Sequence, residues 1–275
     1  MKRRAVGLLI FALAFAVCAW AAEPARKPIK VLLVTGNDVG AHEWQKTSPQ
    51  LKKILDETKK FDVKMVEINK NPNILDSADE LKEFDVIVQN YVSLKLPPIS
   101  DKAKENLLSF VRDGKGFVCF HMSSASWADW EEFHKLCGRY WVMGKSGHGP
   151  RGTFQAKIVD PKNPITRGAK DFEADDELYA KLLVGDEKIN VLVAADSEWS
   201  KQNEPLVFTK DYGKGRMFQF CFGHDVKALE NPSVGRIFAR GVEWAATGAV
   251  TRGGPGGAKG GKKAGDEAKP AAAAK

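Results

Sequence analysis

The chain contains few cysteines and lacks the short motifs that mark several common enzyme classes. Only four of its 275 residues are cysteine, and no Cys-x-x-Cys pair is present, which argues against a cysteine-based zinc site. Beyond residue 22 the cysteines are odd in number and irregularly spaced, so we expect no disulfide framework. The glycines of residues 36–40 have neither GxGxxG spacing nor a Walker lysine, and we therefore expect no nucleotide cofactor.

A hydrophobic run long enough to span a membrane is also missing near the N-terminus. The apolar residues 5–17 follow three basic residues and precede the small residues Ala19 and Ala21. This arrangement predicts a secretory signal peptide over residues 1–22, because the run is shorter than a typical transmembrane helix. We expect export to the periplasm or cell exterior, without stable membrane insertion after cleavage.

A strongly basic folded surface is the third absence, despite a formal net charge of +7. The signal peptide contributes three of these charges. Residues 252–275 contribute six Lys or Arg against two acids, a net charge of +4. The residues between these two segments therefore have a formal net charge of zero. A balanced surface argues against nucleic-acid binding. We predict that the Gly-, Ala- and Lys-rich residues 250–275 form a disordered tail.

The intervening residues 28–249 show the alternating pattern of one α/β domain. Apolar runs predict strands at 29–35, 63–68, 85–91 and 117–120, and helical spacing predicts helices at 48–60, 101–112 and 232–246. Alternation of this kind predicts a parallel sheet covered on both faces. Further strands at 153–159, 190–195, 205–209 and 216–222 predict an antiparallel addition at one edge. The expected fold class is a flavodoxin-like, three-layer α/β sandwich.

Four of the five histidines follow predicted strands. They are His42, His121, His148 and His224. Open α/β sheets bind ligands beyond the carboxyl ends of their strands, and imidazole suits both proton transfer and metal binding near neutral pH. We therefore predict that His121, His148 and His224 are catalytic or hold a divalent metal such as zinc.

Six further side chains are candidates for substrate binding. They are His42, Trp44, Ser123, Trp127, Glu177 and Asp225. Tryptophan faces suit the apolar faces of sugar rings. Glu177 could pair with sugar hydroxyls or with a histidine, and Asp225 could bind a hydroxyl or orient an imidazole. Each has a simpler alternative, because tryptophans usually pack in the core, Ser123 could bond to its own loop, and Asp225 could cap the segment that follows.

Several short motifs, in a consistent order, resemble the ThuA-like family, named for a trehalose-utilisation protein. The resemblance runs from about residue 30 to residue 248 and includes His42-Glu-Trp44, Phe120-His121, Ser146-Gly-His-Gly149, Asp176-Glu-Leu-Tyr179, Tyr212-Gly-Lys-Gly-Arg216 and Gly223-His-Asp225. It implies a fold like that of class I glutamine amidotransferases and a role in carbohydrate use. His121 stands where those enzymes carry their nucleophilic cysteine, so amidotransferase activity is not expected.

Three functional hypotheses remain open at this point. The leading one is an exported hydrolase or lyase that acts on oxidised sugars, chiefly 3-keto-glycosides, with histidines as base or metal ligands. The alternative is a non-catalytic carbohydrate-binding module on an amidotransferase-like scaffold, since fold alone does not imply catalysis. The weakest is a cysteine or serine hydrolase using Cys119, Ser123 or Ser124, because the GxSxG motif is absent. A sugar is the expected partner in the first two.

Overall fold

The structure, a computed structural model, describes residues 27–94, 96–186 and 188–251. The predicted signal peptide and residues 252–275 of the predicted tail lie outside these residues. Within the described ranges, no helix combines the length and the apolar character needed to cross a bilayer.

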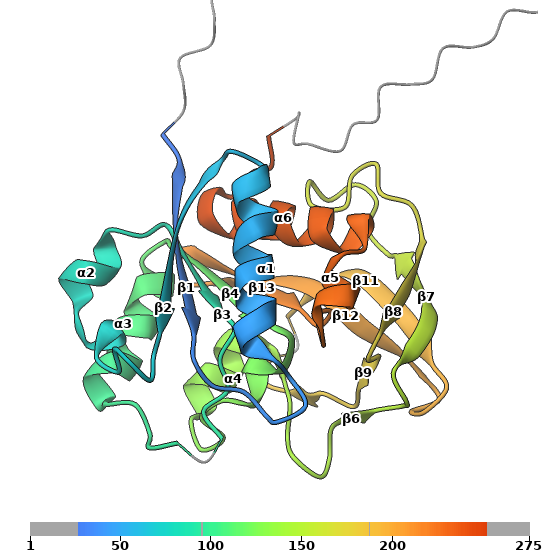
Figure 1. The fold of residues 1–275 in the computed structure, drawn as a ribbon, viewed down its shortest axis with the longest axis horizontal. Coiled ribbons are helices and arrows are strands. Elements are labelled where there is room, and N and C mark those ends of the chain that lie inside the picture. Colours follow the sequence, from blue (N-terminus) through green and yellow to red (C-terminus); the bar gives the residue numbers. More distant parts are fainter. Residues whose placement is uncertain (1–26, 95, 187, 252–275) are drawn as a thin grey trace, which may run out of the picture.

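A nine-stranded mixed sheet forms the centre of the molecule (Figure 1), with strand order β2-β1-β3-β4-β13-β12-β11-β7-β8. The first five of these strands run parallel to their neighbours, and the last four are antiparallel additions. The parallel part has the flavodoxin-like order 2-1-3-4-5. The predicted fold class is therefore confirmed. The strands of this sheet are β1 (Ile29–Thr35), β2 (Phe61–Glu67), β3 (Val86–Gln89), β4 (Gly116–Phe120), β7 (Gly152–Ile158), β8 (Phe172–Asp176), β11 (Asn190–Ser197), β12 (Gln202–Tyr212) and β13 (Gly215–Phe220).

Helices cover both faces of the parallel part, and the alternation of strand side chains explains why. In β1, Val31 and Leu33 point into one core, whereas Leu32 and Val34 point into the other. All four side chains are almost fully buried, as expected for a strand covered on both sides. On the first face lie α1 (Trp44–Glu57), α5 (Val226–Leu229) and α6 (Pro232–Thr247), and on the second lie α2 (Ala78–Lys82), α3 (Asp101–Arg112) and α4 (Glu131–Cys137).

Short elements complete the chain. They are the 3-10 helices at Ile74–Asp76 and His121–Ala125, and the two-residue strands β5 (Arg139–Tyr140), β6 (Gly147–His148), β9 (Tyr179–Ala180) and β10 (Leu183–Val184). β6 pairs with β9, which places His148 opposite Tyr179. The sequence predicted a glycine-flanked loop for His148, whereas this ladder holds it in place.

The predicted helix at 48–60 begins and ends about one turn too late. The structure has α1 from Trp44 to Glu57. Its first turn is anchored by Thr47, whose hydroxyl accepts a hydrogen bond from Asn90 at the end of β3. This tertiary contact connects residues far apart in the sequence.

The three cysteines in the described residues are free and buried, as expected.

Candidate metal centre

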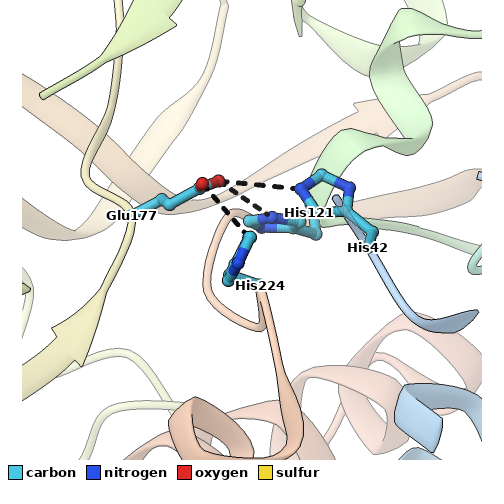
Figure 2. A group of neighbouring side chains, drawn as sticks. All are labelled: His42, His121, Glu177 and His224. Atoms are coloured by element: carbon cyan, nitrogen blue, oxygen red, sulfur yellow. Dashed lines mark ion pairs between the residues drawn. The ribbon is translucent and has the colours of Figure 1, made fainter. Parts of the chain in front are cut away.

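Four side chains from separate parts of the chain converge at one edge of the sheet (Figure 2). The ligand atoms of His42, His121, Glu177 and His224 all lie within 4.8 Å of one another. Three of the residues are buried, and the side chain of His224 retains 16% exposure. Three imidazoles and one carboxylate at this spacing form a donor set that suits zinc and related divalent metals.

The fold brings these residues together because each follows the end of a strand. His42 lies in the connection from β1 to α1, His121 directly follows β4, and His224 lies in the connection from β13 to α5. These three strands are parallel, so their carboxyl ends meet at the same edge. Glu177 arrives from the antiparallel part, directly after β8. His121 has a positive φ of 46°, a conformation that costs a non-glycine residue free energy and is often found at functional sites.

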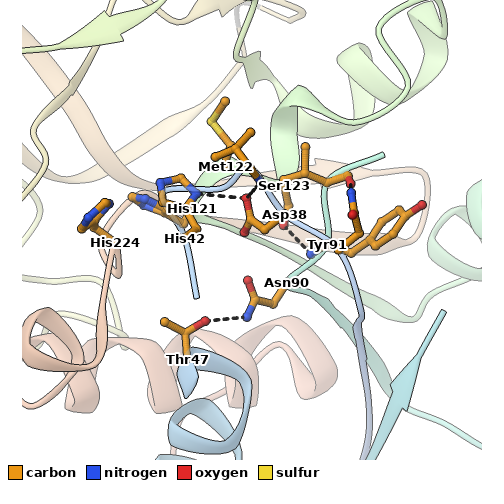
Figure 3. Close-up of polar contacts among 12 residues, drawn as sticks. Asp38, His42, Thr47, Asn90, Tyr91, His121, Met122, Ser123 and His224 are labelled. Carbon is orange, nitrogen blue, oxygen red and sulfur yellow. Dashed lines mark hydrogen bonds and ion pairs between the residues drawn. The ribbon is translucent and has the colours of Figure 1, made fainter. Parts of the chain in front are cut away.

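Hydrogen bonds at Nδ1 fix the tautomers of two histidines of the cluster. Nδ1 of His42 lies 3.0 Å from Oδ1 of Asp38 (Figure 3), and Nδ1 of His121 lies 2.7 Å from the carbonyl oxygen of Cys221. A carbonyl oxygen and an ionised carboxylate can only accept hydrogen bonds. Nδ1 of each histidine therefore carries the proton and donates. In the neutral form of each ring, the lone pair is then on Nε2, the atom that faces Glu177. Acceptors of this kind orient metal-binding histidines in proteins.

The atoms at the centre of the cluster are close together but incompletely paired. Oε2 of Glu177 lies 3.6 Å from Nε2 of His42 and 3.7 Å from Nε2 of His121. Nδ1 of His224 lies 3.1 Å from Oε1 of Glu177, although not in hydrogen-bonding geometry. Both Oε2 of Glu177 and Nδ1 of His224 are buried without a hydrogen-bond partner. Buried polar atoms are costly in this state, and a cation between them would satisfy them together.

The electrostatics of the cluster also favour added positive charge. Burial lowers the pKa of His42, but Asp38 and Glu177 outweigh it and raise that pKa to about 9. For Glu177, burial acts to raise the pKa, but contacts with His121, His224 and His42 hold it well below the usual range. The carboxylate is thus ionised, and the adjacent imidazole attracts a proton. A divalent cation could take the place of that proton.

Asp176 holds the backbone of two residues of the cluster, Glu177 and His224. Its carboxylate accepts hydrogen bonds from the backbone N–H groups of Gly223 at 2.7 Å, His224 at 3.2 Å and Glu177 at 2.8 Å. Burial raises its pKa, against the effect of His121 and these N–H groups. One buried carboxylate therefore ties the end of β8 to the connection that carries His224.

Tyr179 occupies the remaining side of His121. Its hydroxyl lies 2.8 Å from Nε2 of His121, and the two rings stack with centroids 4.3 Å apart. Because Nδ1 of His121 holds the ring proton, the tyrosine hydroxyl is the donor to Nε2. Burial raises the pKa of Tyr179, so the hydroxyl keeps its proton. Tyr179 therefore competes with a metal for this lone pair.

His148 lies beside the cluster but outside the group of four ligand atoms. Its Nε2 is 3.4 Å from Oε1 of Glu177, and its side chain is 32% exposed. Its Nδ1 lies 2.6 Å from the carbonyl oxygen of Gly149 and donates to it, which leaves the lone pair on Nε2. His148 is thus the most accessible of the histidines around Glu177.

Four of the six predicted substrate-binding residues lie outside the cluster, and two of them, Ser123 and Trp127, are held within the protein interior. Ser123 donates to the carbonyl of Gln89 at 2.7 Å and accepts from the backbone of Tyr91 at 3.2 Å, which fixes its loop (Figure 3). Trp127 is buried against the rings of Trp130 and Phe133 in the core beneath α3 and α4. The structure thus agrees with the simpler alternatives, in which Ser123 bonds within its loop and Trp127 packs in the core.

Asp225 and Trp44 also contribute nothing to the cluster. Asp225 accepts from the backbone N–H of Ala228 at 2.8 Å, so it caps α5, and it pairs with Arg151 at 3.0 Å. Trp44 is the half-buried first residue of α1. The fifth histidine, His134, stacks on Tyr140 away from the cluster.

Sequence reasoning missed part of the candidate ligand set. It assigned His42 and Glu177 to substrate binding, but the structure places both among the four converging groups. It also missed Asp38, the partner of His42. The spacing of Asp38 and His42, four residues apart after a strand, was a usable signal. For Glu177 no comparable local signal exists, because the strand that precedes it was not predicted.

The described cysteines cannot serve as nucleophiles in this arrangement. Cys119 is fully buried, and burial together with the nearby Cys137 raises the pKa of its thiol well above the ordinary value. A thiol without a thiolate form is a poor nucleophile. Ser124 is also fully buried, and its hydroxyl accepts from the backbone of Trp141. The cysteine or serine hydrolase hypothesis therefore has no support in the geometry.

Comparison with solved structures agrees with this architecture. A ThuA-like protein from Parabacteroides merdae is 27% identical, with a TM-score of 0.72 over 83% of this chain and 94% of that chain. A ThuA-like protein from Bacteroides uniformis is 17% identical, with a TM-score of 0.61 over 84% and 98%. A β-galactosidase from Bacillus circulans shares the fold over 76% of this chain and 30% of its own, at 11% identity and a TM-score of 0.51.

The sequence itself identifies the family. No curated protein matches it significantly. The family model described as "ThuA: Trehalose utilisation" matches residues 30–245, most of the chain and nearly all of its described part. Every residue of the four-membered cluster falls within that match. The chain belongs to the ThuA trehalose-utilisation family.

Proposed function

We propose that this chain is a metal-dependent enzyme that acts on oxidised sugars, in particular 3-keto-glycosides, after export from the cytoplasm. The observation that carries the proposal is the convergence of His42, His121, Glu177 and His224 within 4.8 Å. Membership of a carbohydrate-utilisation family directs the proposal to sugars. A divalent cation held by these four residues would supply positive charge to an oxygen that becomes negative during the reaction.

His148 is the base in this proposal. A ketone makes the C–H bond on the neighbouring carbon acidic, so a base of near-neutral pKa suffices to remove that proton. The hydrogen bond from Nδ1 of His148 to Gly149 leaves the lone pair on Nε2. Its side chain is 32% exposed, compared with 6% for His42 and 3% for His121. His148 can thus reach a substrate, while the more deeply buried imidazoles hold the cation.

The reaction balances without any redox partner. Nε2 of His148 takes the proton from the carbon that lies between the ketone and the anomeric carbon. The released electron pair forms a double bond to the anomeric carbon, and the bond to the glycosidic oxygen breaks. That oxygen takes up the proton from His148 and leaves as an alcohol. Water then adds across the double bond, so the net reaction is hydrolysis. This route does not require two carboxylates flanking the bond.

Carbohydrate binding without catalysis is the second candidate. It is favoured by the burial of the cluster, because His121 is 2% and Glu177 7% exposed. In that case a cation would hold the loops in place, and the sugar would contact only the accessible edge at His148 and His224.

Turnover and metal content together test the proposal. Purified mature protein would be assayed for bound metal, and then for cleavage of a 3-keto-disaccharide and its unoxidised parent, with and without zinc. We expect cleavage of the oxidised sugar alone. His148→Gln should reduce turnover at least about a hundredfold and leave metal content unchanged. The matched control is His134→Gln, since His134 stacks on Tyr140 outside the cluster.

Two outcomes would overturn parts of this picture. Unchanged turnover in His148→Gln would remove that residue from the mechanism. Stoichiometric metal with sugar binding, but no product from any oxidised sugar, would establish the binding module instead.

A further inference from the structure

A second cavity, away from the metal centre, lies between α1 and α6. Its volume is about 630 Å³, and none of the metal-centre residues lines it. It is lined by Lys53 and Ile54 of α1, by Arg236 and Arg240 of α6, and by Arg167. The volume falls in the range of small-molecule sites, which hold ligands by apolar walls and a few placed polar groups.

Three arginines give this groove an unusual concentration of positive charge. Arg236 and Arg240 lie four residues apart on α6, where like charges repel and destabilise a helix. NH1 of Arg240 donates to the backbone carbonyls of Ile165 and Arg167, which holds the guanidinium beside the Arg167 segment. Burial, together with the charges of Arg236 and Arg167, lowers the pKa of Arg240. The arrangement therefore costs the folded protein free energy.

Within the described ranges, no carboxylate forms an ion pair with these arginines, although the charge of Glu243 acts to raise the pKa of Arg240. Arg236 forms no ion pair there, and its Nε is buried without a hydrogen-bond partner. Glu243, also on α6, is already engaged by Lys60 at 2.8 Å and by the hydroxyl of Thr251 at 2.7 Å. Glu57 and Glu230 line the groove, but neither is paired with an arginine. Two guanidinium groups that line a cavity without a carboxylate partner among the described residues offer a favourable position for an anion.

We propose that this groove binds a small molecule bearing a tetrahedral oxyanion, either phosphate or sulfate, through Arg236 and Arg240. The forked guanidinium group matches such anions and forms two hydrogen bonds at once. The exposed side chains of Lys53 and Arg167 would attract the anion at the rim. Ile54, which lines the same groove, offers apolar surface to the carbon part of the ligand. This site is independent of the proposed chemistry at the metal centre.

Calorimetric titration of the full mature chain at constant ionic strength tests the proposal. The probes are inorganic phosphate, inorganic sulfate, glucose 6-phosphate and a sulfated disaccharide. We expect binding of phosphate or sulfate that becomes at least about tenfold weaker in Arg236→Gln and in Arg240→Gln. Lys102→Gln, which removes one exposed charge from α3, is the matched control and should bind as the wild type does. Tighter binding of one organic probe would identify the natural source of the anion.

Two further measurements distinguish loss of the anion site from loss of folding and from loss of charge alone. Without anion, Arg236→Gln should melt no lower than the wild type, because it relieves repulsion from Arg240. Arg236→Lys keeps the charge but loses the fork, so it too should bind the anion more weakly than the wild type. Equal affinities in Arg236→Gln and Lys102→Gln, or no binding of any probe in the millimolar range, would overturn the proposal.

Discussion

Nδ1 of His42 lies 3.0 Å from a carboxylate oxygen of Asp38, and both side chains are almost fully buried, at 6% and 5% exposure. This contact directs the lone pair of Nε2 towards Glu177. Asp38 forms no hydrogen bond or ion pair with His121, Glu177 or His224, so it acts by orienting His42 and by making its ring more basic.

Asp38→Asn should therefore weaken metal binding without removing a ligand. Loss of the carboxylate reduces the basicity of His42 and its hold on the ring, and we expect zinc affinity to fall about 10- to 100-fold. Competition with a chromogenic chelator would measure it. Asp62→Asn on the exposed face of β2 is the control and should bind zinc normally. An equal affinity in the two variants would show that Asp38 does not support the site.

The raised pKa of His42 predicts how the stability of the metal-free protein depends on pH. Its pKa is about 9 in the folded protein, above the ordinary 6.5. A group with a raised folded pKa contributes stability that is fully present below the unfolded pKa and is lost as pH rises through the folded pKa. Unfolding free energy should thus fall between about pH 6.5 and pH 9, by at most about 3 kcal/mol.

Urea unfolding with chelator present, from pH 6 to pH 10, would measure this fall. His42→Gln should flatten it. With saturating zinc the trend should be reversed over the same range, because a metal binds the neutral imidazole and competes with the proton. If the metal-free wild type and His42→Gln show the same pH profile, the interaction of Asp38 and Glu177 with a protonated His42 is not what the geometry indicates.

The sequence predicts the parallel half of the fold well, because local patterns determine it. The strand at 29–35 and the helix at 101–112 were predicted with the bounds that the structure shows. In β1, continuous burial on two faces leaves an apolar run that is easy to recognise. Sequence also placed His121 and His224 correctly beyond strand ends, since that position follows from chain order alone.

The antiparallel half carries a weaker signal, and this is why Glu177 was not predicted to lie among the candidate metal ligands. β8 reads Phe-Glu-Ala-Asp-Asp, with acids at positions that usually lie in solvent. Asp176 is nevertheless buried, because three backbone N–H groups from distant and neighbouring residues bond to it. His148 is held by a two-residue ladder with Tyr179. Such contacts depend on tertiary structure, and no local pattern reveals them.

Tyr179→Phe tests whether the Tyr179 hydroxyl competes with a metal for Nε2 of His121 or instead stabilises the bound metal. In the metal-free protein the Tyr179 hydroxyl donates to Nε2 of His121 at 2.8 Å. Removal of this buried bond should lower the metal-free unfolding free energy by about 1 kcal/mol. Zinc affinity should rise, because the metal no longer displaces a hydrogen bond. Chemical unfolding and chelator competition would measure the two effects. A loss of zinc affinity would mean instead that the hydroxyl supports the bound metal.

Gly223 should be the most sensitive glycine near the metal centre. It has a φ of 112°, a conformation that side chains rarely adopt. A Cβ there would lie 2.2 Å from Cζ of Phe120, whereas a Cβ at Gly40 meets nothing within 4 Å. Gly223→Ala should thus destabilise the fold by about 2–4 kcal/mol, and Gly40→Ala should be nearly neutral.

The same substitution should also reach the metal. The backbone N–H of Gly223 donates to Asp176 at 2.7 Å, and the next residue is the ligand His224. A shift of this segment moves Nδ1 of His224 away from Glu177, so zinc affinity should fall together with stability. Thermal melting with and without zinc would measure both, because a metal that binds only the folded state raises the melting temperature. If Gly223→Ala melts at the same temperature as Gly40→Ala and zinc raises both melting temperatures equally, the close contact of Gly223 with Phe120 does not position His224.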